Sequence, residues 1–211
     1  MSPRRFVPVI GLVGGVGSGK SAVARFLSAE RNVVIIDGDE IGHLVLNDRC
    51  VKDQIRLRFG ATVFDTQGEV NRTALGHEVF GSSTEKRQAR ANLESIVHSR
   101  IREGIVERIA DARTRGNVEA IILDAAVLLE AGWNDLCNAV VFVDATRQKR
   151  LERVQENRGW NLEKLKAREA SQSPLKSKRN ASDNIVDNSG ALQEAATQLG
   201  QIFDQIIHDH R

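Results

Sequence analysis

The sequence predicts an α/β protein: a three-layer α/β/α fold around a five-stranded parallel sheet, with a helical insertion and a helical lid. Short apolar runs rich in β-branched residues alternate with much longer stretches of helical pattern, which is typical of buried parallel strands joined by helices. The first apolar run also ends in a glycine-rich turn that leads directly into a helical pattern. We expect ligands where the carboxyl ends of such strands open.

Five apolar runs are expected to form the strands. They cover residues 7–13, 33–36, 121–123, 139–143 and 184–186. The last run is followed by a turn signal, Asp-Asn-Ser-Gly, at residues 187–190. The final helix has apolar residues at helical spacing from Leu192 to Ile206, so it should pack on the sheet.

The turn after the first strand carries a phosphate-binding motif. Residues 14–21 read Gly-Gly-Val-Gly-Ser-Gly-Lys-Ser and fit the P-loop pattern G-x-x-x-x-G-K-[ST] at every fixed position. A strand that ends in this turn and continues as a helix aims several backbone N–H groups at one point, where a triphosphate tail binds. Lys20 supplies a charge for the β- and γ-phosphates, and the Ser21 hydroxyl is a ligand for Mg²⁺.

Two stretches fall outside the sheet core. The first is mostly helical and charged, with helices expected over 51–59, 73–80 and 84–115, far more chain than one crossover requires. The second holds eleven Lys and Arg residues, although the whole chain is nearly neutral. We therefore expect a nucleotide-binding core over 1–40, 118–145 and 183–211, a substrate-holding lobe over 41–117, and a lid over 146–182, called here the basic segment.

Carboxylates follow two of the expected strands. Asp37 and Asp39 come after the second strand, and Asp124 ends the third. Phosphoryl transfer to an alcohol needs a group that orients the hydroxyl and accepts its proton, and Asp39 is the candidate. Asp37 could position the loop or a metal-bound water, or cap the helix expected to begin at Glu40. Asp124 is the candidate carboxylate for Mg²⁺, the alternative being a strand-end turn residue.

The basic segment suits a transition state that spreads negative charge over phosphoryl oxygens, because guanidinium forks match that geometry. Arg153 and Arg168 are the expected contacts. Most of the other charges in the segment are expected to lie on solvated helix faces, where an isolated pair contributes little.

Several other residues have structural alternatives to a functional role. Glu130 could touch substrate or bond to nearby backbone. His98 is expected to make a hydrogen bond in the substrate lobe or to lie on a helix face, since an Asp is already available as the base. Trp133 and Trp160 are expected to pack, although Trp160 lies in the basic segment and could touch adenine.

Composition excludes several classes of protein. A formal charge of +2 with 27% charged residues gives no general attraction to nucleic acid or membranes. The basic residues of the segment 146–182 are not interleaved with aromatics, as a groove for single-stranded nucleic acid requires. The guanine-selecting motif N-K-x-D of nucleotide switches is absent. The remaining class is an enzyme for small molecules.

Location is predicted from the cysteines and the apolar runs. Cys50 and Cys137 lack disulfide or metal-ligand spacing, which fits a reducing compartment. No apolar run reaches the roughly 18 residues of a membrane span. The apolar stretch after Arg4 and Arg5 offers no small-residue cleavage site. We expect a cytoplasmic protein, with a monomer as the default.

In their order and spacing, these motifs resemble those of the dephospho-CoA kinase family. The resemblance covers nearly the whole chain, from Gly11 to about Gly190. It rests on the P-loop and on residues 37–39, Ile41, His43, Phe59-Gly60, Gly68, Arg72, Val79-Phe80, Leu93-Glu94, His98, Asp124, residues 128–130, Gln148, Arg150-Leu151, Arg153, Arg168, Gln172, Pro174-Leu175, Lys178 and residues 185–190.

The resemblance implies a P-loop kinase related to nucleoside monophosphate kinases. In that family ATP phosphorylates the ribose 3′-hydroxyl of dephospho-CoA to give CoA, the last step of coenzyme A biosynthesis. The family's site residues carry over as catalytic Asp39, Lys20 and Arg153; as ATP-binding Gly15, Val16, Gly17, Ser18, Gly19, Lys20, Ser21, Ala22, Arg153 and Arg168; as acceptor-binding Asp37, Asp39, Arg72, His98 and Glu130; and as metal-binding Ser21 and Asp124. The alternative is another small-molecule or nucleoside monophosphate kinase.

The chain departs from the family's usual pattern at four positions. The family usually has Thr at Ala22, Ala at Gly38, and Pro at Ser99 and Ala126. Ala22 removes a hydroxyl beside the phosphates, but backbone amides still hold the anion. Ser99 and Ala126 loosen turns that proline would stiffen, so they bear on acceptor geometry and not on the class of reaction.

Overall fold

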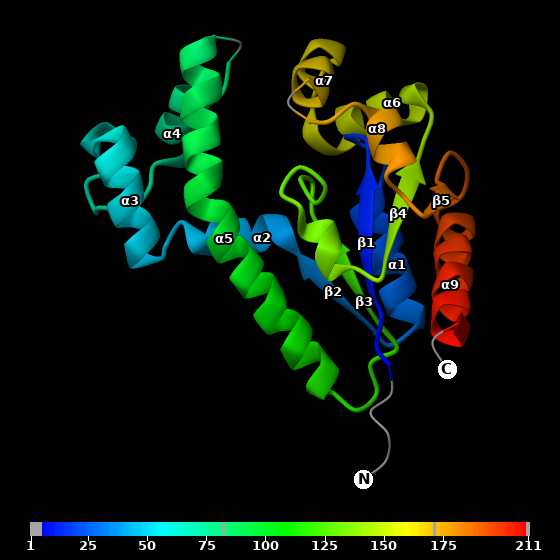
Figure 1. Ribbon diagram of the computed structural model, residues 1–211. Coiled ribbons are helices and arrows are strands. Elements are labelled where there is room, and N and C mark those ends of the chain that lie inside the picture. Colours follow the sequence, from blue (N-terminus) through cyan, green and yellow to red (C-terminus); the bar gives the residue numbers. More distant parts are fainter. Residues whose placement is uncertain (1–5, 82, 171, 210–211) are drawn as a thin grey trace. The chain divides into compact units, whose positions relative to one another are not determined.

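The computed structural model describes residues 6–81, 83–170 and 172–209 (Figure 1). Residues 1–5, on which part of the prediction about location rests, lie outside the described residues. The described residues form two compact units, one from the ranges 6–37 and 108–209 and the other from the range 38–107. In the described part, no helix is long and apolar enough to cross a membrane.

The first unit is built on a five-stranded sheet. Its strands are β1 (Val9–Gly14), β2 (Val33–Asp37), β3 (Ala120–Asp124), β4 (Ala139–Asp144) and β5 (Asn184–Asp187). They run in the order β2-β3-β1-β4-β5, and every pair is parallel. This confirms the predicted sheet. β1 starts two residues later than expected, after Pro8, which has no N–H to donate to the ladder.

Helices cover both faces of this sheet. On one face α1 (Lys20–Glu30) and α9 (Leu192–Asp209) pack side by side and bury one core cluster with the strands. This cluster includes Ile10, Leu12 and Phe203. On the other face Gly11 lies so close to the chain after β3 that an added Cβ would be 2.9 Å from Leu128 and Cys137 atoms. Burial raises the pKa of the Cys137 thiol to about 12, so it stays protonated at neutral pH.

The basic segment forms three helices of the first unit. They are α6 (Arg147–Arg158), α7 (Leu162–Glu169) and α8 (Leu175–Asn180). Outside the basic segment, a short 3-10 helix, η2 (Trp133–Leu136), precedes β4. The hydroxyl of Thr146 caps α6 and the amide oxygen of Asn161 caps α7. Trp133 is buried, in agreement with its expected packing role.

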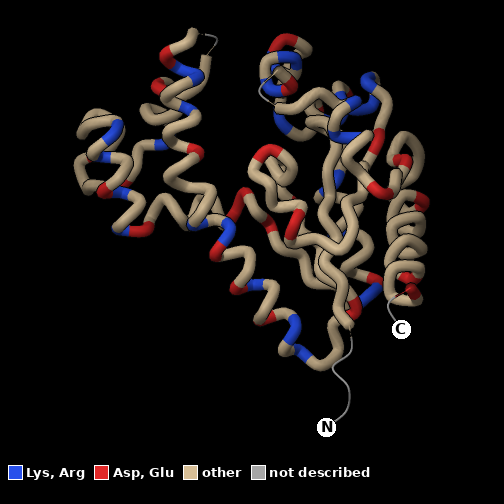
Figure 2. The backbone as a smooth tube through the Cα atoms, viewed as in Figure 1, with Lys and Arg blue, Asp and Glu red and all other residues tan. Residues whose placement is uncertain are grey.

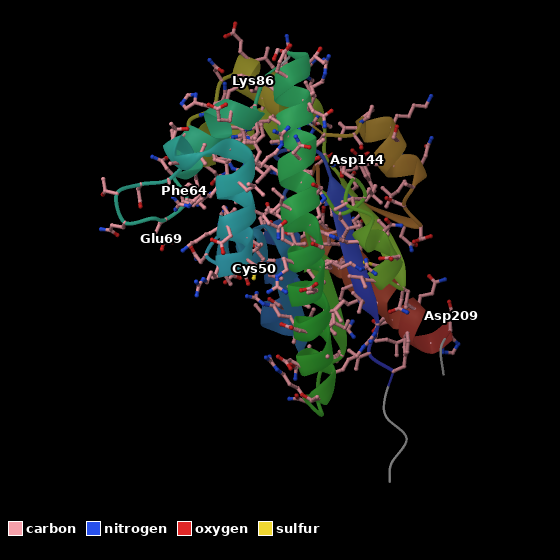
Figure 3. The ribbon with its side chains drawn as sticks, turned by 60° about the vertical axis from the view of Figure 1, so that its left-hand side comes forward. Cys50, Phe64, Glu69, Lys86, Asp144 and Asp209 are labelled. Carbon is pink, nitrogen blue, oxygen red and sulfur yellow. The ribbon has the colours of Figure 1, made fainter. Side chains whose placement is uncertain are left out.

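The second unit is helical. It contains α2 (Gly38–Val45), α3 (Arg49–Phe59), η1 (Ala61–Val63), α4 (Arg72–Val79) and most of α5 (Thr84–Thr114), which continues into the first unit. Its own core consists of apolar residues from α3, η1 and α4, with partly buried residues of α5 packed on them. Residues 64–70 form a turn in this unit (Figure 3). An antiparallel bridge between Phe64 and Val70 and an ion pair between Lys52 and Glu69 (2.6 Å) hold the turn.

Positive and negative side chains are interspersed along both units (Figure 2). Of the basic segment's cations, several have partners close by. Lys149 pairs with Glu152, Arg150 with Glu169, Lys178 with Glu130 and Arg179 with Asp144. Two of these cations are deeply buried, since Arg150 is 5% exposed and Lys178 is 2% exposed.

Candidate nucleotide site

The P-loop lies between β1 and α1, as its pattern predicts. α1 begins at Lys20, and Gly19, the residue before it, has φ 87°. Within the loop, the amide of Ser18 donates to the Gly15 carbonyl (3.0 Å). The first amides of a helix have no partner inside the helix and carry the positive end of its dipole. The turn therefore presents N–H donors to an anion at the carboxyl end of β1.

Glycine is required in this loop by close neighbours as well as by backbone angles. Gly17 has φ 78°, and a Cβ there would lie 2.6 Å from the Arg150 carbonyl oxygen. A Cβ on Gly19 would lie 2.4 Å from the side-chain nitrogen of Asn188. Both positions are in a region that side chains rarely adopt. The loop is thus packed against α6 and against the chain after β5.

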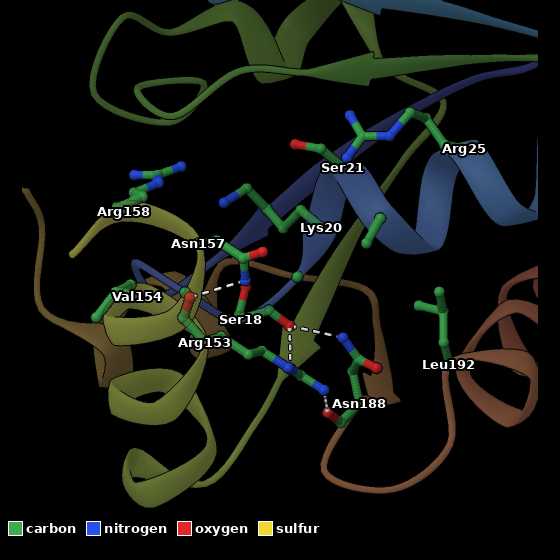
Figure 4. A pocket seen from close by; sticks show the side chains of 13 residues that line it. Ser18, Lys20, Ser21, Arg25, Arg153, Val154, Asn157, Arg158, Asn188 and Leu192 are labelled. Carbon is green, nitrogen blue, oxygen red and sulfur yellow. Dashed lines mark hydrogen bonds between the residues drawn. The ribbon is translucent and has the colours of Figure 1, made fainter. Parts of the chain in front are cut away.

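A cavity of about 420 Å³ opens over the loop and the start of α1 (Figure 4). The chain after β5 and the last turns of α6 form its other walls. Its lining consists of Gly17, Ser18, Gly19, Lys20, Ser21, Ala22, Arg25, Arg153, Val154, Asn157, Arg158, Asn188 and Leu192. Six of the eight residues predicted from the P-loop lie in this lining, and Gly15 and Val16 do not.

Ser21 and Asp124 are brought together by the sheet. Asp124 is the last residue of β3, aligned with Leu12 of β1 and with Asp37 of β2. Its carboxylate accepts a hydrogen bond from the Ser21 hydroxyl, and the residue is 7% exposed. The structure therefore places a hydroxyl oxygen and a carboxylate oxygen side by side at the edge of the sheet where the P-loop leads into α1.

The two arginines predicted in the basic segment lie in different places. Arg153 lines the cavity, and its guanidinium donates to the carbonyl oxygens of Ser18 (3.1 Å) and Asn188 (2.8 Å). Arg168 is not among the residues that line the cavity, and its guanidinium carbon lies 5.8 Å from the centre of the Trp160 ring. The structure thus brings Arg153, but not Arg168, to the P-loop.

Glu130 bonds to the basic segment. Its carboxylate accepts from the Ser173 amide (2.8 Å) and pairs with the ammonium of Lys178 (3.1 Å). Burial by itself raises the pKa of Glu130, but these neighbours outweigh it and hold the pKa below its ordinary value. Lys178 also donates to the Ala126 carbonyl (3.3 Å), at one of the positions where the family usually has proline.

The other predicted residues belong to the second unit. Asp39 is in the first turn of α2, which begins at Gly38 and not at Glu40 as expected; a carboxylate there is favoured by the helix dipole. The Arg72 guanidinium lies 2.7 Å from Nε2 of the His43 ring and donates to it in the tautomer that leaves this nitrogen without a proton. His98 is on α5, where burial lowers its pKa against the opposing effect of Glu94.

Five lining residues were not predicted from the sequence: Arg25, Asn157, Arg158, Asn188 and Leu192. Arg25 carries a usable signal, because it is four residues after Ser21 on the same helix and so lies on the same face. Asn188 belongs to the turn after the fifth strand, but its burial against Ser18 depends on the order of the strands. No feature of the sequence distinguishes Arg158 from other exposed charged residues at helix ends.

The site and the fold can be compared with known proteins. A family model described as dephospho-CoA kinase matches residues 8–194. The dephospho-CoA kinase of Latilactobacillus sakei subsp. sakei is 34% identical over 200 residues, covering 94% of this chain and 96% of that protein. The dephospho-CoA kinase of Thermobifida fusca is 33% identical over 198 residues, covering 93% and 95%.

Two solved structures share the fold. The crystal structure of TT1252 from Thermus thermophilus has a TM-score of 0.78 at 26% identity and covers 95% of this chain and 98% of its own. Dephospho-CoA kinase from Campylobacter jejuni shares the fold, with a TM-score of 0.59 at 19% identity, and covers 94% of this chain and 97% of its own. On the family match and the level of identity to its members, the chain belongs to the dephospho-CoA kinase family.

Proposed function

We propose that this protein transfers the γ-phosphoryl group of ATP to the ribose 3′-hydroxyl of dephospho-CoA, giving CoA and ADP. The observation that carries the proposal is a P-loop cavity with no Asp or Glu among its described lining residues, in a chain of the dephospho-CoA kinase family. A cavity lined by Lys20, Arg25, Arg153 and Arg158 favours a highly anionic ligand such as a triphosphate.

The donor half of the reaction belongs to residues 17–22. The N-terminus of α1 lies at the cavity, where the positive end of the helix dipole favours phosphate oxygens, and Lys20 adds a point charge. Ala22 presents only its backbone at the position where the family usually has Thr. Electrostatic stabilisation by such fixed groups supplies most of the catalysis in phosphoryl transfer, because the protein does little covalent chemistry.

The residues present fit a magnesium ion. Ser21 and Asp124 supply two adjacent oxygens, and Mg²⁺ in kinases takes one or two protein ligands with waters and substrate phosphates. The described residues include no group of three or more His, Cys, Asp and Glu that could form an all-protein metal site, which also suits such a sparse site. When bound, the ion neutralises charge on the phosphates.

The acceptor half is proposed to use the second unit. Asp39 would orient the acceptor hydroxyl and take its proton. Arg72 and His98 of this lobe would bind the acceptor. Asp37 at the end of β2 and Glu130 after β3, both in the first unit, are also proposed as acceptor-binding residues. In the transfer step the hydroxyl oxygen bonds to the γ-phosphorus, the bond from that phosphorus to the β–γ bridging oxygen breaks, and the proton passes to Asp39.

The experiment that tests this function is an acceptor panel. The protein with Mg-ATP is incubated with dephospho-CoA, AMP, adenosine or shikimate, and the product is identified by mass. We expect a gain of one phosphate only on dephospho-CoA, with one ADP released per CoA formed. Preferred phosphorylation of another acceptor would support the alternative of a different small-molecule kinase. Lys20→Ala is the control for the donor site and should abolish transfer.

A cytoplasmic location and a monomeric state stay predictions from the sequence.

A further inference from the structure

The four cations that line the cavity are not equivalent. Two donors of the Arg153 guanidinium are used on the Ser18 and Asn188 carbonyl oxygens. Asn188 in turn donates from its side chain to the same Ser18 oxygen (2.7 Å). Arg153 is therefore a brace between α6, the P-loop and the chain after β5. A guanidinium engaged in this way has fewer donors for a ligand.

Arg158 is held in a different way. Its guanidinium carbon lies 5.0 Å from the centre of the Trp160 ring, within the range of a cation–π interaction. Among the ion pairs found for the described residues, Arg158 has no carboxylate partner. A ring contact orients the guanidinium without using its N–H donors, so these stay available for oxygens.

The end of α6 explains why the Trp160 ring is there. Gly159 caps the helix in a left-handed conformation, and the Trp160 amide donates back to the Val154 carbonyl (3.1 Å). This ending reverses the chain and brings the ring back to the last helical residue. No atom lies within 4 Å of a Cβ built on Gly159, so glycine is favoured there by the positive φ of the backbone and not by close packing.

The other end of α6 is fixed to the P-loop. The buried Arg150 guanidinium donates to the Val16 carbonyl (3.4 Å) and pairs with Glu169 of α7. The Arg150 carbonyl also lies against Gly17. Because α6 is anchored at its start, the position of Arg158 at its end is set relative to Lys20. Figure 4 shows the Arg158 and Lys20 side chains directed into the same part of the cavity.

We propose that Arg158, oriented by Trp160, is the arginine of the basic segment that contacts the phosphoryl oxygens of ATP, and that Arg153 is a positioning residue. This rests on the proposed function. Arg158 forms no covalent bond in the step described above; it stabilises the charge that develops as the γ-phosphoryl group moves from ATP to the acceptor oxygen, with ADP as the leaving group. Trp160 acts through Arg158 as a second positioning residue.

The first test compares two cations next to the same ring. Lys164 lies 5.2 Å from the Trp160 ring but does not line the cavity. Arg158→Met should lower kcat about 100-fold, the effect of removing one preorganised donor of this kind, whereas Lys164→Met should leave kcat within about twofold. Arg153→Met should lower the melting temperature and raise the KM for ATP. A kcat for Arg158→Met within about threefold of the wild-type value would overturn the proposal.

The second test asks whether Trp160 works through Arg158. Trp160→Leu should lower kcat about threefold, the equivalent of one exposed cation–π contact, and Trp160→Phe should restore most of it. In the Arg158→Met background, Trp160→Leu should have no further effect, since the two residues act as one unit. An equal loss in both backgrounds would contradict the positioning role.

A binding measurement separates this proposal from the proposed function. Tryptophan emission of the protein is followed during titration with inorganic tripolyphosphate, which has neither adenine nor an acceptor. We expect a change that is lost in Trp160→Phe and in Arg158→Met but kept in Lys164→Met. A change that persists in Arg158→Met would overturn the contact. A protein that gives this response but phosphorylates no acceptor would refute only the proposed function.

Discussion

At the scale of single residues, the site depends on what each side chain is already bonded to. Lys20 and Ser21 follow from the P-loop pattern, and Asp124 meets Ser21 because β3 lies next to β1. Arg153, which the sequence suggested as a catalytic cation, donates to backbone carbonyls in the structure. Residue type and spacing therefore predict which functional groups are present. The hydrogen bonds that these groups already make determine how many of their donors are left for a ligand.

The general base is tested by Asp39→Asn. This change keeps the size of the side chain and removes its ability to accept a proton. We expect kcat to fall roughly 10²- to 10⁴-fold, with the affinity for ATP unchanged, because Asp39 is not among the residues that line the P-loop cavity. Steady-state kinetics and equilibrium binding of ATP measure the two quantities. Glu40→Gln, at the next position of α2, is the control; comparable losses in both variants would remove Asp39 from the role.

The close packing of the P-loop is tested by Gly19→Ala. A Cβ there meets Asn188 at 2.4 Å and occupies a backbone region disfavoured for alanine. We expect a loss of roughly 2–4 kcal/mol in the free energy of unfolding together with a higher KM for ATP. Gly159→Ala shares the backbone strain but has an open surrounding, so it should cost only about 1–2 kcal/mol. Urea unfolding compares them, and equal losses would show that packing at Gly19 adds nothing.

At the scale of elements, the sequence predicts the strands and most helices well because their signals are local. β-branched runs, caps and turns act over a few residues, and the predicted strands lie within two residues of those observed. The anchoring of the basic segment is different. Its buried cations, Arg150 and Lys178, pair with Glu169 and Glu130, which are 19 and 48 positions away in the sequence. Such pairs depend on how helices pack, so no local pattern distinguishes these cations from solvated ones.

The anchoring of α8 to the chain after β3 is tested by Glu130→Gln. The change weakens the partner of the buried Lys178, so we expect about 1–3 kcal/mol lower stability at neutral pH. The folded-state pKa of Glu130 lies below its ordinary value of 4.5. The carboxylate therefore stabilises the fold above pH 4.5, and this contribution is lost as pH falls through the lower folded-state pKa.

Unfolding curves at several pH values measure this difference. The gap between wild type and Glu130→Gln should be largest at neutral pH and should shrink below about pH 4.5. Glu152→Gln is the matched control. Glu152 pairs with Lys149 three residues away on an exposed helix face, where solvent screens the charges and a pair contributes little. A gap for Glu130→Gln that does not change with pH would assign its effect to packing and not to charge.

At the scale of the whole molecule, the two compact units suggest a division of labour between the substrates. The P-loop cavity is formed entirely by residues of the first unit, and the proposed acceptor residues Asp39, Arg72 and His98 belong to the second. Each unit has its own apolar core. A ligand that binds only the native form of one unit stabilises that unit by mass action, by about 2.7 kcal/mol at 100 times its Kd.

Hydrogen exchange with each ligand separately tests this division. Mg-ATP is expected to slow exchange mainly at residues 17–25 and 150–158, and dephospho-CoA mainly within residues 38–107, because local opening of a unit becomes rarer when its ligand is bound. Lys20→Ala should lose the protection by Mg-ATP and keep the protection by dephospho-CoA. Protection by dephospho-CoA confined to the first unit would refute the acceptor lobe, since the helices of residues 38–107 would then have no contact with the molecule that is phosphorylated.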